Sequence, residues 1–434
     1  MSDQPVAAEP DEVPESTAEP LLAPADGVPP LTDTVESVVR AAELLAAGTG
    51  PLAVDAERAS GFRYSARAYL IQFRRKGAGT VLLDPIPIVE AAGVAGLQPL
   101  AEVVNPLEWV LHSADQDLPG LAELGMRPAV LYDTELAGRL AGFERVGLAA
   151  IVERTLGLAL QKGHGAADWS TRPLPDTWLN YAALDVEVLV ELRDAMAAEL
   201  EAQGKSGWAA EEFEHIRLAG PPPPKPDRWR RTSGIHAVKS ARTLGAVREL
   251  WTTRDEIAQR RDIAPSRILP DSAIVAAAQK DPTTMNDLRT LPVFGGPRQR
   301  RSSAVWLGAL ERARTLGDGD LPPVSQPFTG PPPVSRWSRR NPEAAARLTA
   351  ARAGLTELST EVSVPLENLL TPDLVRRLCW DWTPREDGTV ADAVDRFLTE
   401  GGARPWQRTL TVPVLAAALI SAEIPAPDPN VTDE

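Results

Sequence analysis

Hydrophobic and polar positions along the chain change from an α/β pattern to a purely helical one. Short β-prone apolar runs come first, at residues 51–57, 68–73, 80–85 and 108–112. Helical periodicity then takes over, at residues 134–143, 148–156 and most clearly 177–200. Strands with helices on their flanks predict an α/β domain. From residue 226 onward the pattern predicts helices only.

Proline-rich segments mark where the folded parts begin and end. The chain has 434 residues, of which 41 are prolines, and four of these are consecutive at 221–224. Such a run favours a stiff polyproline II spacer. The pattern predicts, in chain order, a disordered acidic tail at 1–32, an α/β domain at 33–218, a linker at 219–225, a helical domain at 226–316, a linker at 317–334, a second helical domain at 335–423 and a disordered tail at 424–434.

The two helical blocks look alike when they are set 100 residues apart. This offset pairs Pro265 with Pro365 and Leu269 with Leu369. Both blocks then show a long helix, a short turn through proline and a further helix that starts near residue 271 or 371. We interpret them as two copies of one small helical module, the alternative being chance similarity between amphipathic helix pairs.

Charge is distributed unevenly along the chain. The formal net charge is −15, but residues 221–330 hold 18 basic and 11 acidic side chains, a balance of +7. A basic segment between acidic ones is typical of a polyanion contact, although a solvated basic face explains it equally well. Of the 45 basic residues 39 are arginines, a bias that a GC-rich genome would also produce.

Several classes of protein are excluded. No apolar stretch reaches the 18 residues of a membrane span, so we expect no membrane partner. The N-terminus is acidic and lacks the apolar core of a signal peptide, which predicts a cytoplasmic protein. The single cysteine, Cys379, excludes an intramolecular disulfide and a cysteine-rich zinc site. No phosphate-binding glycine loop is present, so we expect no nucleotide cofactor.

Acidic residues at the ends of predicted strands and helices are the candidate catalytic or metal-binding residues. Asp55 and Glu57 are two apart on a predicted strand and therefore share a face, as oxygen ligands of a hard cation would. Tyr181 and Asp185 are four apart on a predicted helix and also share a face. Each motif alone has an alternative: solvated acids at a strand end, or a core tyrosine beside a solvent-facing acid.

A further pair of acids, Asp115 and Asp117, precedes a helical run. A carboxylate at a helix start usually caps free backbone N–H groups, which is the structural alternative for either residue. The order Asp-x-Glu, Asp, Tyr-x3-Asp over about 130 residues of α/β pattern is more specific than any single motif.

This order resembles that of the DEDD superfamily of 3′-to-5′ exonucleases, within it the ribonuclease D branch, which has a ribonuclease-H-like fold. Asp55 and Glu57 match its first motif, His112 and Asp117 its second, and Tyr181 and Asp185 its third. The position five before Asp185 is Asn180 rather than histidine, which indicates the Tyr type. Lys162-Gly and the stretch from Asp168 to Leu174, which contains Arg172, also match. The helical blocks resemble the helicase-and-ribonuclease-D C-terminal (HRDC) module.

The resemblance implies a mechanism and a set of contacts. Asp55, Glu57, Asp117 and Asp185 would hold two Mg²⁺ or Mn²⁺ ions, and Tyr181 would orient the attacking water. The substrate would be an RNA 3′ end, as in tRNA precursors, and the product a nucleoside 5′-monophosphate. Expected nucleic-acid contacts are His112, Lys162, Arg172, Arg228, Trp229, Arg230, Arg231, Arg242 and Arg248.

Two other functions stay open at this point. A DNA exonuclease of the Werner type shares the same five site residues, so single-stranded DNA is an alternative substrate. A non-catalytic RNA-binding protein with a relic nuclease fold would have lost a metal ligand, and none is missing here. Two departures from the family pattern stand out: Arg58 follows Glu57 where many relatives have an aromatic residue, and the second helical block is diverged and net negative.

Overall fold

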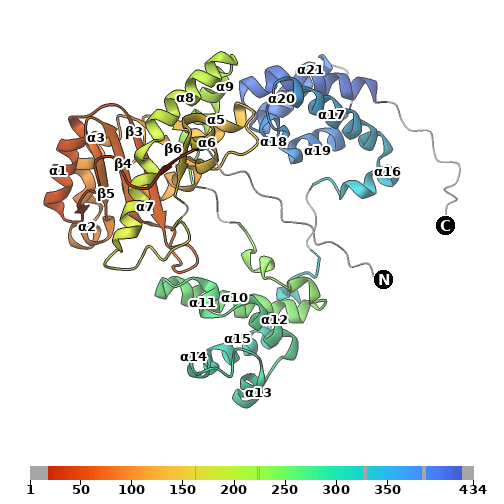
Figure 1. Ribbon diagram of the computed structural model, residues 1–434. Helices are drawn as coiled ribbons and strands as arrows, with labels where there is room; N and C mark the ends of the chain where they lie inside the picture. The colour runs from red at the N-terminus through yellow and green to blue at the C-terminus, as the bar shows by residue number, and fades with distance from the viewer. Residues whose placement is uncertain are drawn as a thin grey trace, which may run out of the picture.

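The computed structural model describes residues 18–161, 163–221, 223, 225–325, 330–383 and 388–422. The chain forms an α/β domain followed by two helical modules (Figure 1). None of the helices in these ranges is long and apolar enough to cross a membrane.

A six-stranded mixed sheet organises the α/β domain. Its strand order is β2-β5-β4-β3-β6-β7, with β3 antiparallel to β4 and parallel to β6. The strands are β2 (Leu31–Thr32), β3 (Thr49–Arg58), β4 (Ala68–Lys76), β5 (Gly79–Leu83), β6 (Glu108–Leu111) and β7 (Val130–Asp133). The four apolar runs read from the sequence are β3 to β6, whereas the short β2 and β7 were not predicted.

Helices cover both faces of this sheet (Figure 1). The helices of the domain are α1 (Val35–Ala46), α2 (Pro85–Ala92), α3 (Gln98–Val104), α4 (Leu118–Glu123), α5 (Thr134–Leu140), α6 (Leu148–Leu156), α7 (Asp176–Glu187), α8 (Leu189–Ala202) and α9 (Ser206–Leu218). Alternation along β4 sends Ile71 and Phe73 into the core that holds α1 and α3, and Leu70 into the one that holds α7.

The helix predicted over residues 177–200 is two helices in the structure. Val188 has φ −115° and ψ 8°, outside the helical range, and it ends α7 and precedes α8. The break lets α7 pack on β3, β4 and β5 while α8 packs on β3 and β6. Hydrophobic periodicity continues through the break because both helices bury one face in the same domain.

The prediction of a disordered tail at 1–32 is wrong for residues 18–32, and residues 1–17 lie outside the described ranges. β1 (Glu19–Leu21) pairs in parallel with β8 (Leu158–Leu160). Further along, Asp26 forms an ion pair with Arg74 at 3.3 Å. The prediction of disorder rested on the low content of apolar side chains in this segment. In the structure, backbone hydrogen bonds and ionic contacts hold the segment instead. The tail predicted at 424–434 also lies outside the described residues.

The two helical modules repeat one order of helices. The first contains α10 (Ala241–Arg261), α11 (Pro265–Ile268), α12 (Asp271–Lys280), α13 (Met285–Thr290), α14 (Pro297–Arg301) and α15 (Ser303–Thr315). The second contains α16 (Trp337–Arg340), α17 (Pro342–Glu361), α18 (Leu366–Leu369), α19 (Pro372–Asp381), α20 (Val390–Glu400) and α21 (Pro405–Ser421). Long, short and medium helices at α10 to α12 recur at α17 to α19, and Leu269 and Leu369 are both fully buried.

The linker predicted at 317–334 does not begin directly after α15. Arg242 donates to the carbonyl of Leu316 at 2.6 Å, and Arg248 donates to that of Asp320 at 3.2 Å. Arg230 likewise donates to the carbonyl of Pro323 at 2.9 Å. Residues 316–323 therefore pack against the first helical module, although their proline and glycine content indicated a spacer.

Candidate active site

The central strand β3 carries the first two acidic residues to one edge of the fold. Leu52 and Val54 are fully buried in the core, and the strand continues into Asp55 and Glu57. Asp55 lies opposite Gln72 of β4, and Glu57 lies opposite Leu70. Because residues two apart on a strand point to the same face, both carboxylates project toward α7.

Helix α7 brings the third acid to the same place. Ala182 and Ala183 are fully buried against the sheet, and their small side chains allow the helix to approach closely. Carboxylate oxygens of Asp55, Glu57 and Asp185 lie within 4.8 Å of one another. Tyr181 lies one turn before Asp185, close enough for the two side chains to influence each other's pKa. The first and third motifs of the sequence therefore meet in space.

Asp117 completes the group from the turn after β6. Asp117 is buried, 7% exposed, and its pKa is raised first by burial and then by charge repulsion from Asp55, whereas Asp115 is exposed. The Asp117 carboxylate lies 3.7 Å from Nε of Arg58, whose Nη2 donates to Gln116 at 3.3 Å. These positions favour Asp117 over Asp115 as the acid of the second motif.

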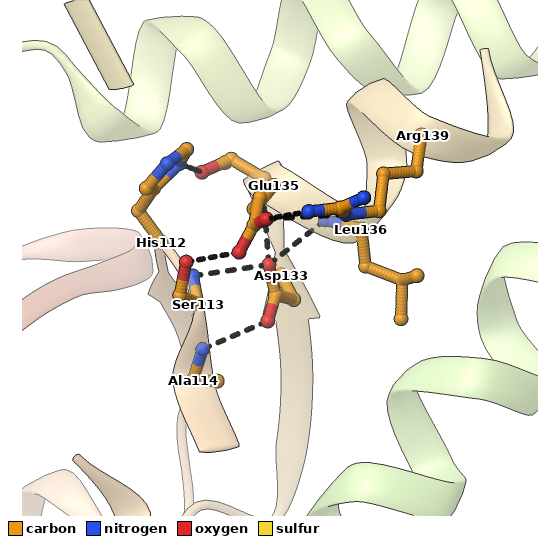
Figure 2. A network of polar contacts seen from close by, with 8 residues as sticks. His112, Ser113, Ala114, Asp133, Glu135, Leu136 and Arg139 are labelled. Carbon is orange, nitrogen blue, oxygen red and sulfur yellow. Dashed lines mark hydrogen bonds and ion pairs between the residues drawn. The ribbon is translucent and has the colours of Figure 1, made fainter. Parts of the chain in front are cut away.

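A polar network fixes the turn that leads to Asp117 (Figure 2). The Asp133 carboxylate, at the end of β7, accepts hydrogen bonds from the backbone N–H groups of Ala114 at 2.8 Å and Leu136 at 3.1 Å. Ser113, in the left-handed region at φ 61°, donates through its hydroxyl to Glu135. Asp133 was not predicted as part of the site. Its position directly after an apolar run and at the start of a helix could have indicated a capping role.

Burial and mutual repulsion dominate the electrostatics of the cluster. Burial raises the pKa of Asp55, Glu57, Asp117 and Asp185. Neighbouring carboxylates raise the pKa of Glu57 further, Asp55 most and Asp185 next, while Arg58 lowers it. Burial, and then the charge of Asp185, also raises the pKa of the Tyr181 hydroxyl. A bound cation would relieve this repulsion directly.

The donor set fits a hard divalent cation. All of its ligands are carboxylate oxygens, which Mg²⁺ and Mn²⁺ prefer over Zn²⁺-type nitrogen and sulfur ligands. Three of them converge within 4.8 Å, and the fourth, Asp117, is buried beside them. Clustered buried acids without a compensating cation would be costly. Among the described residues, Arg58 is the one basic side chain that lowers the pKa of Asp55, Glu57 and Asp117.

Three sequence families match separate parts of the chain. A 3′-5′ exonuclease family matches residues 32–201, an HRDC domain matches 243–310, and a 3′ to 5′ exonuclease C-terminal domain matches 330–419. A ribonuclease D from Gluconacetobacter diazotrophicus is 31% identical over 288 residues, 65% of this chain and 71% of that protein.

This chain belongs to the ribonuclease D family. Two solved structures resemble it as well. A protein from Bifidobacterium adolescentis is 38% identical, with a TM-score of 0.85 over 93% of this chain and 100% of its own. Escherichia coli RNase D shares the fold at 24% identity, with a TM-score of 0.63 over 86% and 98% of the two chains. The α/β domain is accordingly a hydrolytic 3′-to-5′ exonuclease.

The segment before α7 covers Tyr181 of this ribonuclease D family member. A Cβ atom on Gly163 would come within 2.6 Å of the Tyr181 ring, so only glycine fits there. The His164 ring lies 5.7 Å from the ring of Tyr181, at nearly a right angle to it. Lys162, an expected substrate contact, lies outside the described residues.

Two other expected contacts in this domain are bound internally. The guanidinium of Arg172 donates to both oxygens of Asp84, at 2.6 and 2.9 Å, and to the carbonyls of Tyr69, Trp169 and Thr171. These bonds occupy all five of its donors, so Arg172 would have to exchange one of them to contact nucleic acid, and that contact stays a prediction. His112 is half-buried, its Nδ1 lies 2.9 Å from Thr134 Oγ1, and burial lowers its pKa to about 4.

The expected contacts in the first helical module are mostly engaged within the module. Trp229 is 5% exposed and its indole N–H donates to Asp227 at 3.0 Å, so its ring packs within the module, and its contact with nucleic acid stays a prediction. Arg228 lies 3.7 Å from Asp255 and over the ring of Trp251. Arg230, Arg242 and Arg248 donate to backbone carbonyls. Arg231 is exposed and stays a prediction.

Proposed function

We propose that this chain is a divalent-metal-dependent 3′-to-5′ exoribonuclease that removes nucleoside 5′-monophosphates one at a time. The observation that carries the proposal is the convergence of Asp55, Glu57 and Asp185 within 4.8 Å, beside the Tyr181 hydroxyl. The names of its curated relatives, ribonuclease D, support RNA as the substrate. By the same resemblance, the physiological role is 3′ maturation or turnover of structured RNA such as tRNA precursors.

The position of each side chain in the site suggests its role in catalysis. Asp55, Glu57 and Asp185 would hold one cation, and Asp117 together with Asp55 would hold the second. When bound, such cations activate water and stabilise the charge that develops on the scissile phosphate and its leaving oxygen. The Tyr181 hydroxyl, on the same helix as Asp185, would orient the attacking water. The network around Asp133 would keep Asp117 in place.

Metal binding and chemistry are tested together by calorimetry and product analysis. We expect Mn²⁺ to bind the wild-type protein, and Asp55→Asn or Glu57→Gln to weaken binding and to abolish release of mononucleotides from a 3′-tailed RNA. Asp176→Asn is the matched control, because Asp176 is exposed in the first turn of α7. Mononucleotide release that survives either ligand substitution, or that persists in chelator, would refute the proposal.

Substrate class is tested with RNA and DNA oligonucleotides of one sequence. We expect faster hydrolysis of the RNA, with 5′-phosphorylated mononucleotides as products. Equal or faster hydrolysis of DNA would favour the Werner-type alternative. Tyr181→Phe keeps the ring and removes the hydroxyl, so turnover should fall by about 10- to 100-fold while substrate binding changes little.

A further inference from the structure

A cleft in the first helical module gathers arginines that were not predicted as contacts. It has a volume of about 550 Å³ and lies between the end of α10, α11, α14 and the start of α15. Arg261, Arg298 and Arg301 line it, and no acidic residue is part of its described lining. All three arginines are exposed to solvent.

These arginines differ from Arg242 and Arg248 of the same module in what surrounds them. Arg242 and Arg248 are engaged by carbonyls of residues 316–320. Within the part of the chain that the structure describes, the guanidinium groups of Arg261, Arg298 and Arg301 have no hydrogen bond or ion pair. Three uncompensated positive charges around one hollow attract an anion with several charges spaced along it.

The floor of the cleft is built from fixed side chains. Gln299 is 7% exposed; its amide donates to the carbonyl of Ile268 at 2.6 Å, and its oxygen accepts from the indole N–H of Trp306 at 2.9 Å. Gln299 lies between Arg298 and Arg301 in α14, so the anchored residue holds the backbone that carries both arginines. A prearranged site of this kind loses little conformational entropy when it binds.

The cleft begins beside the contact between this module and the exonuclease domain. Asp262, directly after Arg261, accepts hydrogen bonds from the backbone N–H of Ser65 at 2.8 Å and from Arg67 at 2.9 Å. Ser65 and Arg67 belong to the β3–β4 loop, which follows the Asp55 and Glu57 strand. Arg261 therefore lies one residue from the contact with the loop that connects β3 to β4.

We propose that the cleft binds the phosphate backbone of the RNA upstream of the 3′ end that is being trimmed. The proposal rests on the proposed function for its ligand, a ribose-phosphate chain. Guanidinium groups bind phosphate oxygens through paired hydrogen bonds, and three of them around the cleft would engage about three phosphates. The cleft therefore distinguishes long RNA from short oligonucleotides, whereas the acidic cluster acts on both.

The test is RNA affinity as a function of salt, measured by fluorescence anisotropy with chelator present so that no hydrolysis occurs. The variant carries Arg261→Gln, Arg298→Gln and Arg301→Gln. The charge-matched control carries Arg336→Gln, Arg339→Gln and Arg340→Gln, which are exposed on the second helical module. We expect the variant to bind a 20-nucleotide RNA at least about tenfold more weakly, with a salt slope reduced by about 2, and the control to match the wild type.

A second readout separates this proposal from the proposed function. Hydrolysis of a four-nucleotide RNA should be the same in the cleft variant and the wild type, while hydrolysis of the long RNA falls. Unchanged affinity and slope in the variant, or an equal loss in the control, would overturn the cleft proposal. If the wild type hydrolyses neither RNA, the proposed function fails, and the anisotropy measurement still decides whether the cleft binds RNA.

Discussion

The two helical modules share a plan of helices but contact the exonuclease domain in different ways. The second module contributes Val364, Leu369 and Trp406 to the hydrophobic core of the exonuclease domain. The indole of Trp406 stacks on that of Trp208 of α9, with ring centres 5.1 Å apart and planes 15° apart. This contact combines apolar packing with an ion pair between Arg404 and Glu212 at 2.6 Å, so it binds the second module firmly to the exonuclease domain.

The first module contacts the exonuclease domain mainly through polar groups. Tyr64 donates to Asp255 at 3.0 Å, and Ser65 and Arg67 donate to Asp262. Arg267 donates to the carbonyl of Gly61 at 2.8 Å and lies over the ring of Phe62. Polar, partly solvated contacts are weaker and depend on salt. The second module is thus part of the scaffold, while the first presents arginines that have no partner among the described residues.

Substitution of Trp406 should have the largest effect on this arrangement. Trp406→Ala removes a buried ring and leaves the Glu212 carboxylate, which accepts from the indole N–H at 2.9 Å, with one partner fewer. We expect a loss of about 3 to 5 kcal/mol in the free energy of unfolding, measured by denaturant titration. Ile420→Ala, in the same helix but 71% exposed, is the control and should change stability by less than about 0.5 kcal/mol. A small loss in Trp406→Ala would show that the second module is not part of the scaffold.

Removal of the Asp262 carboxylate should have an intermediate effect, confined to the first module. Asp262→Ala leaves the Ser65 N–H and the Arg67 and Tyr69 side chains without this acceptor. We expect the docking of the module to weaken by about 1 to 3 kcal/mol, visible as a larger radius of gyration in solution scattering. Denaturation of the exonuclease domain should stay nearly unchanged; joint unfolding of both parts would contradict the distinction between the two interfaces.

Arg267→Ala should weaken the same docking less. It removes one hydrogen bond to Gly61 and the stacking of the guanidinium over the Phe62 ring, 4.1 Å from its centre. These contacts together account for about 1 to 2 kcal/mol at a partly exposed site. Scattering at increasing salt should show the variant undocking at lower ionic strength than the wild type. Identical salt profiles would mean that Arg267 does not stabilise the docked arrangement.

Acid should loosen the first module before the second, though only weakly above pH 3. Burial opposes the effect, but hydrogen bonds from Ser65 and Arg67 lower the pKa of Asp262 to about 2, from an ordinary value of 3.8. The stabilisation is therefore fully present above about pH 4 and is lost as the pH falls through about 2. Asp262→Asn, which cannot ionise, should remove this pH dependence of docking. If docking of the Asp262→Asn variant weakens with acid as much as docking of the wild type, another group causes the pH dependence.

The fold was predictable where burial is continuous along the chain. Strands such as β3 and β4 bury consecutive apolar residues and were found, whereas β1, β2 and β8 are edge strands of two or three residues held by backbone pairing. Nothing in their side chains distinguishes such short strands from a loop. The repeat of the helical modules was readable because the same buried leucines recur at a fixed offset.

The site was predictable only in part. Acid spacing and family resemblance singled out Asp55, Glu57 and Asp185, which the structure brings together. The basic contacts were harder, because charge alone does not reveal which arginines are already paired. Arg242 is held by a carbonyl 74 residues away in sequence, while Arg298 has no such partner among the described residues. Long-range pairing of this kind depends on the tertiary fold.

The most direct test of the central claim is single-turnover hydrolysis of a 5′-labelled, 3′-tailed RNA by Asp185→Asn beside Asp176→Asn. Both residues lie on α7, but only Asp185 belongs to the carboxylate cluster. With Mg²⁺ or Mn²⁺, the account predicts a ladder that shortens from the 3′ end in the wild type and in Asp176→Asn, and a rate at least about 1,000-fold lower in Asp185→Asn. A ladder of wild-type rate from Asp185→Asn, or from the wild type in chelator, would contradict it.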